Sequence, residues 1–257
     1  MEKLNIAYIQ ANLVWENSAA NLKMLENRFD KIENTNIVVL PEMFNTGFTM
    51  NVKGQAQLPA GDVMQWLKLK AKEHNFAIMG STIINDGGKY YNRFFMVTPQ
   101  GSTEQYDKRH LFRMGDEHKN FTAGNKLQTF NYLGWRIRPL ICYDLRFPVW
   151  SRNKNNYDLL IYVANWPKAR REVWKTLLKA RAIENQCYVI GVNRVGNDGM
   201  GIEYSGDSVV IDPKGSIISQ LPENNEATGT ASISLSELQV FRSKFPVHFD
   251  ADDFTIL

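Results

Sequence analysis

Short apolar runs alternate with amphipathic helical periods along this chain, and this alternation restricts the possible fold more than any other feature. Runs such as NIVVL at 36–40 and DLLIYVANW at 158–166 are typical of buried strands. Helical periodicity predicts helices over 18–34, 61–75 and 170–186, the first of them with Ser18 as a possible N-cap. Because both helices and hairpins separate the strands, the sequence predicts an α/β protein with a mixed sheet.

Tight turns mark three expected hairpins. They lie at 91–108, around Gly134, and at 207–221, where Pro213-Lys214-Gly215 forms the turn. No Gly/Ser linker, low-complexity stretch or charge block divides 1–245, so we expect one domain there. The tail at 246–257 carries no periodic signal.

Composition argues against several classes of partner. The net charge of +3 gives no reason to expect nucleic acid or an anionic membrane, and no apolar run approaches the ~20 residues that span a bilayer. Neither GxGxxG nor GxxxxGK[ST] is present. The N-terminus lacks a signal-peptide pattern, and two cysteines are too few for a disulfide framework. We therefore expect a soluble, cytoplasmic protein with reduced thiols.

Three chemically capable side chains follow expected strands. Glu42 comes after the buried run VVLP, Lys108 follows the second strand of a hairpin, and Cys142 ends the apolar part of RPLICYDLRFPVW. Ligands of α/β proteins bind beyond the carboxyl ends of strands. At such positions a carboxylate suits general-base catalysis, an ammonium can hold an oxyanion, and a thiol can act as nucleophile.

Each of these residues also has a simpler interpretation. Glu42 would be an exposed loop glutamate, Lys108 part of a surface charge cluster, and Cys142 a core cysteine, as Cys187 is expected to be. A sharp strand-to-helix turn after Cys142 would instead expose its sulfur, and the helix N-terminus would favour the thiolate. None of the four histidines has a context that marks it as the base, so a carboxylate is the natural substitute.

Taken in order, LPEMF, DKRHLF and ICYDLRFP resemble the catalytic motifs of the nitrilase superfamily, the carbon–nitrogen hydrolases. The resemblance extends over roughly 4–245 through IAYIQANL, NWP, RAIENQCYVIGVNRVG and GDSVVIDPKG. CYDLRFP is similar to the omega-amidase branch, and above all to bacterial omega-amidases that hydrolyse 2-oxoglutaramate. The resemblance implies a four-layer α-β-β-α sandwich of two mixed sheets. It also implies a homodimer to which the tail at 246–257 contributes, and no cofactor.

The same resemblance implies a role for each motif residue. Glu42 would be the general base, Cys142 the nucleophile that forms a thioester, and Lys108 the oxyanion donor together with the backbone N–H of Tyr143. Glu117, in DEHKNFTAG, resembles the second glutamate of the superfamily, which orients the lysine and contacts substrate. The DEH triplet also raises the alternative of a metal site, but adjacent side chains point different ways, and no metal is expected.

The implied substrate is a short dicarboxylic monoamide, whose distal carboxylate is best held by arginine. Arg146, four residues after the cysteine, is the candidate, although it could pair with Asp144 instead. Trp166 is expected either as a pocket wall or as a core residue. The basic loop PKARR at 167–171 either assists binding or is solvated surface.

The leading hypothesis is an omega-amidase that releases ammonia from 2-oxoglutaramate or 2-oxosuccinamate. One alternative is another amide or carbamoyl hydrolase of the same superfamily, which would act on N-carbamoyl compounds or other amides. A second is a non-catalytic redox-sensing protein on the same fold, in which Cys142 is oxidised and forms no adduct with any amide.

Overall fold

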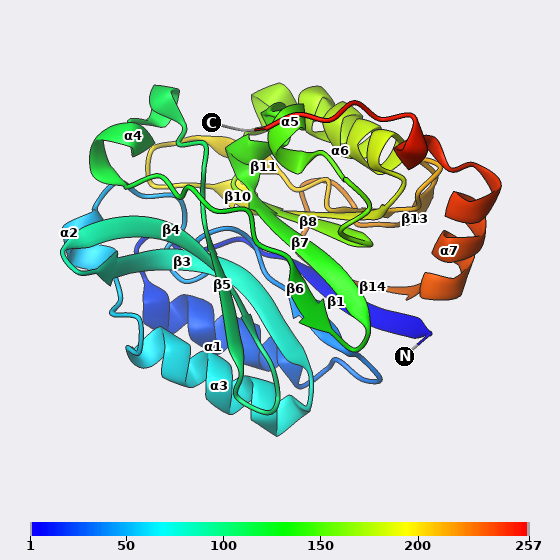
Figure 1. The fold of residues 1–257 in the computed structure, drawn as a ribbon. Helices are drawn as coiled ribbons and strands as arrows, with labels where there is room; N and C mark the ends of the chain where they lie inside the picture. The colour runs from blue at the N-terminus through cyan, green and yellow to red at the C-terminus, as the bar shows by residue number, and fades with distance from the viewer. Residues whose placement is uncertain (1, 256–257) are drawn as a thin grey trace.

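Two six-stranded mixed sheets pack face to face in the computed structural model, which describes residues 2–255 (Figure 1). The first sheet has the strand order β14-β1-β2-β3-β4-β5. Its strands are β14 (Ala227–Ser234), β1 (Lys3–Gln10), β2 (Ile37–Val39), β3 (Ala77–Asp86), β4 (Lys89–Val97) and β5 (Thr103–Asp107).

The second sheet repeats this plan in the order β13-β12-β9-β8-β7-β6. Its strands are β13 (Ile217–Gln220), β12 (Val209–Ile211), β9 (Tyr188–Asn193), β8 (Leu159–Ala164), β7 (Trp135–Ile141) and β6 (Phe130–Tyr132). In each sheet three neighbouring central strands are parallel, β1-β2-β3 and β7-β8-β9, and the flanking pairs are antiparallel. A separate two-stranded sheet is formed by β10 (Val195–Asn197) and β11 (Glu203–Ser205).

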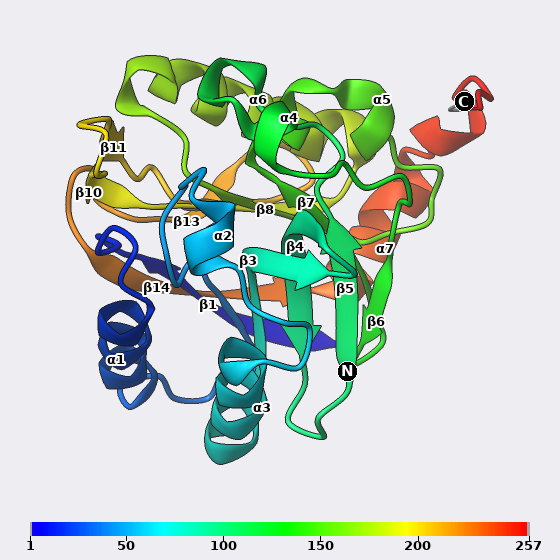
Figure 2. The ribbon, with the colours of Figure 1, turned by 90° about the vertical axis from the view of Figure 1, so that its left-hand side faces the viewer.

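Helices cover the outer faces of both sheets, which completes four layers (Figures 1 and 2). The first sheet is covered by α1 (Ser18–Phe29) and α3 (Asp62–His74), and the second by α5 (Pro148–Ser151) and α6 (Arg171–Asn185). The remaining helices are α2 (Val52–Gln55), α4 (Glu117–Asn120) and α7 (Leu235–Lys244), and short 3₁₀ turns lie at Arg113–Gly115, Cys142–Arg146, Lys168–Arg170 and Val247–Phe249. The four-layer sandwich implied by the family resemblance is therefore confirmed.

The alternation of side chains in β1 explains why this strand lies between two apolar layers. Leu4, Ile6 and Tyr8 belong to the large core cluster shared with the second sheet. Ala7 and Ile9 point the other way, into a cluster with side chains of α1 and α3. Because successive strand residues face opposite sides, a strand segment buried on both faces is continuously apolar, as residues 6–9 of β1 are.

Most predicted elements are confirmed, with two local corrections. The expected hairpins are β4–β5, β6–β7 and β12–β13. The helix predicted over 18–34 ends at Phe29, and its N-cap is Asn17, whose side chain accepts a hydrogen bond from the Ala20 amide, so the assignment of Ser18 as N-cap is wrong. The hairpin β10–β11 was not expected from the sequence.

The C-terminal segment after α7 contacts its own chain. A 3₁₀ turn covers Val247–Phe249, and Asp253 forms an ion pair with Lys154, with 3.1 Å between the carboxylate and Nζ. Lys154 Nζ also lies over the ring of Phe254. In the described residues 2–255, no helix is both long and apolar enough to cross a membrane.

Candidate active site

A buried lysine between two carboxylates forms the centre of the site. Lys108, directly after β5, places Nζ 2.9 Å from Glu42 Oε1 and 2.9 Å from Glu117 Oε2. All three side chains are at most 1% exposed. The interpretations of Glu42 as an exposed loop residue and of Lys108 as a surface charge are therefore wrong. Glu117, from the first turn of α4, also accepts a hydrogen bond from the Phe112 amide at 2.6 Å.

Two buried asparagines complete the hydrogen bonds of these carboxylates, and sequence reasoning did not identify either. Asn92 in β4 donates from Nδ2 to Glu42 Oε1 at 2.7 Å and to Glu117 Oε1 at 3.2 Å. Asn165, directly after β8, donates its backbone N–H to Glu42 Oε2 at 2.8 Å. A polar residue inside the apolar run YNRFFMV was the available signal for Asn92.

Opposing effects set the ionisation of this cluster. Burial works against the charge of Lys108, but Glu117 and Glu42 outweigh it and hold the pKa of the ammonium above its usual value. Burial raises the pKa of Glu117, Lys108 lowers it, and Glu42 raises it further. Lys108 therefore stays protonated and can donate to an oxyanion without acting as an acid.

Cys142 directly follows β7 and is held in an unusual backbone conformation. Its φ is +44°, in the left-handed region that costs free energy for any residue except glycine. The side chain is 9% exposed, and Sγ lies 3.9 Å from the Asn165 carbonyl oxygen. Cys142 is thus buried and belongs to the core cluster, although it borders the site, so the expectation that its sulfur is exposed is wrong. Cys187 is fully buried in the same cluster, as predicted.

The thiol of Cys142 is kept protonated by its surroundings. Burial raises its pKa well above the usual value, Glu42 raises it further, and Lys108 lowers it. The helix expected after the cysteine is a five-residue 3₁₀ turn, Cys142–Arg146, and the raised pKa shows that the surroundings as a whole do not favour the thiolate. A nearby base must therefore remove the proton before the sulfur can attack.

Asp144 connects the segment that carries Lys108 to the turn that carries Cys142. It is fully buried and accepts hydrogen bonds from Tyr106 Oη at 2.8 Å, from the backbone N–H of Ile141 at 3.0 Å and from that of His110 at 3.0 Å. His110 Nδ1 lies 2.7 Å from the same carboxylate. These contacts fix the ends of β5 and β7 relative to each other.

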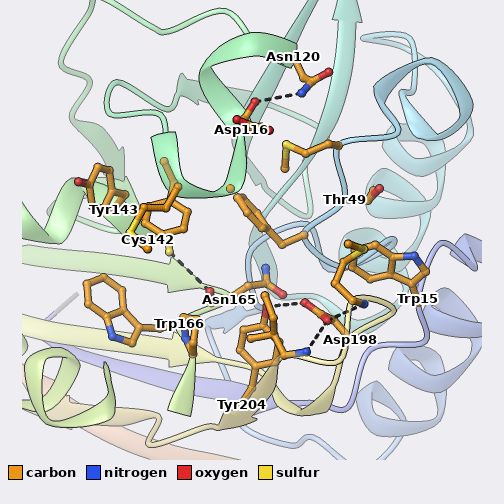
Figure 3. A pocket seen from close by; sticks show the side chains of 18 of the residues that line it. Trp15, Thr49, Asp116, Asn120, Cys142, Tyr143, Asn165, Trp166, Asp198 and Tyr204 are labelled. Atoms are coloured by element: carbon orange, nitrogen blue, oxygen red, sulfur yellow. Dashed lines mark hydrogen bonds between the residues drawn. The ribbon is translucent and has the colours of Figure 1, made fainter. Parts of the chain in front are cut away.

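A cavity of about 690 Å³ opens in front of Cys142. In Figure 3, Cys142 lies between Tyr143 and Trp166 on one side and Trp15 and Asp198 on the other. About half of the lining residues have aromatic, thioether or aliphatic side chains, and most of the others are polar or charged. A cavity that combines apolar walls with polar groups is typical of a small-molecule site.

Each predicted substrate residue borders this cavity. The guanidinium of Arg146 lies over the indole of Trp166, with 5.3 Å from Cζ to the ring centroid, and both residues line the cavity. Asp144 takes its hydrogen bonds from other groups, so the alternative in which Arg146 pairs with Asp144 is wrong. Trp166 is only 3% exposed and belongs both to the cavity wall and to the core, so its two interpretations are both correct.

The DEH triplet does not form a metal site in the structure. Glu117 is bound to Lys108, whereas Asp116 pairs with Lys119 at 2.9 Å. Within residues 2–255, no group of three or more His, Cys, Asp or Glu side chains is arranged to hold a metal ion.

The fold and this site define the chain as a carbon–nitrogen hydrolase. The model of the carbon–nitrogen hydrolase family matches residues 5–243, and the chain belongs to that family. Among its relatives, omega-amidase YafV of Escherichia coli K12 is 47% identical over 256 residues, with 100% of both chains covered. The 2-oxoglutaramate amidase of Bacillus subtilis is 34% identical over 254 residues, covering 96% of this chain and 97% of its own.

A solved structure gives the same result. A carbon–nitrogen hydrolase superfamily protein of Xanthomonas campestris, which carries an arsenic adduct in its active site, superimposes with a TM-score of 0.97. The two sequences are 39% identical, and the match covers 100% of both chains. The superfamily named from the three motifs is thus confirmed.

Glu42 is expected to affect the thiol in two ways: its charge raises the pKa of Cys142, and it acts as the base that removes the thiol proton. Replacement of Glu42 by glutamine should separate these two effects. The carboxylate raises the pKa of Cys142, so Glu42→Gln should lower that pKa and thereby increase the thiolate fraction at pH 7. Alkylation of free Cys142 by iodoacetamide should therefore become faster. Amide turnover should nevertheless fall at least about 100-fold, because the base is lost. Mass spectrometry of the alkylated protein across pH measures the first effect.

Glu16→Gln is the matched control for this experiment. Glu16 is another carboxylate that lines the cavity, but Thr49 and Asn51 already hold it. Its loss should leave the pH dependence of alkylation unchanged. Slower alkylation of Glu42→Gln at every pH would contradict the electrostatic account.

Proposed function

We propose that the protein is an omega-amidase, which hydrolyses the terminal amide of short dicarboxylic monoamides such as 2-oxoglutaramate and 2-oxosuccinamate to the acid and ammonia. The observation that carries this proposal is the buried Lys108 between Glu42 and Glu117, beside a thiol at the end of a cavity. The similarity to omega-amidase YafV over the whole chain supports the same activity.

In the proposed acylation step, Glu42 removes the proton from Cys142 Sγ as the sulfur attacks the amide carbonyl carbon. The carbonyl oxygen becomes an oxyanion, which accepts hydrogen bonds from Lys108 Nζ and the backbone N–H of Tyr143. Glu42 then gives its proton to the amide nitrogen, the C–N bond breaks, and ammonia leaves. A thioester remains on Cys142.

In the proposed deacylation step, Glu42 takes a proton from water, and the resulting hydroxide attacks the thioester carbon. The second oxyanion is held by the same two donors. The C–S bond then breaks, the thiolate takes the proton back from Glu42, and the acid is released. One oxyanion donor is typically worth about 3–4 kcal/mol of barrier, so Lys108 is essential in this scheme.

Glu117 is a positioning residue in the proposed mechanism. It takes two hydrogen bonds from Lys108 Nζ, at 2.9 and 3.0 Å, and so restricts the ammonium to one place. The carboxylate of Glu42 is held by Asn92 and by the Asn165 amide in the same way. Groups fixed before substrate binds need little reorganisation in the transition state, which is the main source of catalysis at such sites.

An ammonia-release screen tests the proposal. The purified protein should release ammonia from 2-oxoglutaramate and succinamate, and the intact protein should gain the mass of the acyl group during turnover. Cys142→Ala should abolish both signals and keep its melting temperature, because the change is small and borders a cavity.

Three outcomes would contradict the proposal. Release from N-carbamoyl compounds alone would favour a carbamoyl hydrolase, and oxidation of Cys142 without any acyl adduct would favour a redox sensor. A collapsed or aggregated Cys142→Ala protein would show that the cysteine serves the core.

Arg146 is proposed to hold the distal carboxylate of the substrate. Its guanidinium lines the cavity and lies on Trp166, so its N–H edge is available to an anion. Arg146→Ala should therefore raise KM for succinamate by roughly 10- to 100-fold, the loss of one charged hydrogen-bonded contact. Steady-state kinetics with butanamide, a neutral amide, gives the comparison, and equal effects on both substrates would contradict the role.

We also propose a cytoplasmic homodimer in which the C-terminal segment contributes to the interface. Phe245 and Phe249, which follow α7, are 59% and 79% exposed, an unusual exposure for phenylalanine. Changing both to serine in the full chain should shift the protein from dimer to monomer in sedimentation equilibrium. Leu69→Ser is the control, because Leu69 is 60% exposed on α3, outside the C-terminal segment. A monomeric unmodified protein would contradict the proposal.

A further inference from the structure

The charged residues that line the cavity fall into two groups. The acids already have partners inside the protein: Thr49 and Asn51 donate to Glu16, Lys119 pairs with Asp116, and Tyr204 with two loop amides donates to Asp198. The two arginines, Arg146 and Arg170, have no carboxylate within 4.0 Å in the part of the chain that the structure describes. The carboxylates of the cavity are therefore already hydrogen-bonded within the protein, whereas the two guanidinium groups lack a carboxylate partner and can receive an anion.

Arg170 differs from the other cations of its basic loop. Lys168 pairs with Glu203 at 2.5 Å, and Arg171 pairs with Asp207 at 2.6 Å. Arg170 instead lines the cavity, half-buried, with Cζ 5.4 Å from the ring centroid of Phe112. For this loop the sequence left two alternatives, assistance in binding and solvated surface. The structure places one of its three cations, Arg170, at the cavity.

Trp166 links the two arginines. Its indole face carries the guanidinium of Arg146, and its Nε1 donates a hydrogen bond to the backbone carbonyl of Arg170 at 2.9 Å. Because Trp166 is almost fully buried, it fixes the position of the loop that carries Arg170. In Figure 3, Trp166 and Tyr143 lie on one side of Cys142, away from Trp15 and Asp198.

An anionic substrate needs cations other than Lys108. That ammonium is already bonded to two carboxylates, so the buried cluster formed by Lys108, Glu42 and Glu117 offers no free positive charge. A guanidinium stacked on an aromatic ring keeps its N–H edge free for a planar acceptor. A carboxylate has about four lone-pair positions, which is enough for two such donors.

We propose that Arg170 is a second anion-binding residue, which acts with Arg146 on the carboxylate end of the substrate and makes the site selective for monoamides that carry a negative charge. A 2-oxo acid adds a carbonyl oxygen next to its carboxylate and so gives the second guanidinium a further acceptor. This inference rests on the proposed omega-amidase function and adds a specificity-determining residue to it.

The test compares succinamate with succinamide, since the two amides have nearly the same shape and differ in the charge of one end. Arg170→Gln should lower kcat/KM for succinamate by roughly 10- to 100-fold and change that for succinamide by less than about threefold. Arg170→Lys should recover part of the loss, because it restores the charge without the planar fork.

Lys168→Gln is the matched control. It removes one positive charge two residues away, from a side chain whose partner is Glu203 on the surface, and should leave both substrates unaffected. Equal losses on succinamate and succinamide in Arg170→Gln, or no loss on either, would overturn the proposal. An equal loss on succinamate in Lys168→Gln would also overturn it, because general electrostatics would then explain the effect.

A binding measurement keeps this inference separate from the proposed function. Glutarate, a dicarboxylate, should protect Cys142 of the unmodified protein from alkylation by iodoacetamide, and Arg170→Gln should need roughly 10- to 100-fold more glutarate for the same protection. If neither 2-oxoglutaramate nor succinamate is hydrolysed but this difference in protection appears, the omega-amidase assignment fails and Arg170 remains an anion-binding residue. If glutarate protects both proteins equally, the role of Arg170 is wrong whatever the substrate.

Discussion

The ammonium of Lys108, buried between Glu42 and Glu117, is the interaction that imposes most on the rest of the structure. Removing an ion from water costs several kcal/mol unless its partners are well placed. Here Asn92, the Asn165 amide and the Phe112 amide supply the remaining hydrogen bonds of the two carboxylates. Those donors come from separate strands and loops, so the cluster is satisfied only when both sheets are correctly formed and packed.

Cys142, directly after β7, is held in a backbone conformation that it would not adopt alone. A positive φ at a non-glycine residue persists only where the surroundings determine it. Asp144 provides that restraint, because it bonds the last residue of β7 and also the loop after β5. Pro148 disfavours helical geometry at Phe147, which is extended and ends the 3₁₀ turn. The 3₁₀ turn that begins at Cys142 is therefore only five residues long.

The sequence identified the motif residues but not the contacts that make them work. Glu42 and Cys142 follow strands whose apolar patterns are local and easily read, and Lys108 follows a strand that the hairpin pattern at 91–108 predicts. Asn165 lies 123 positions from Glu42 in the chain, and its contact exists only because two different sheets bring their strand ends together. The sequence also does not show which cation of the basic loop at 167–171 is unpaired, because ion pairs with acids far away in the chain determine this. Local sequence patterns predict the secondary-structure elements and the motifs. Contacts between residues far apart in the chain determine which groups each motif residue binds.

Burial first, and then the distribution of charge in the site, raise the pKa of the Cys142 thiol and keep it protonated at rest. With both carboxylates ionised, the buried cluster carries one more negative charge than positive, so a thiolate beside it would add like charge in a poorly solvated place. A protonated Cys142 avoids that cost until a carbonyl carbon is present to receive the electron pair. Arg146 and Arg170 add two positive groups to the wall of the cavity in front of this cluster. A monoamide with a carboxylate at one end and a neutral amide at the other matches this arrangement, since each end meets the environment that its charge requires.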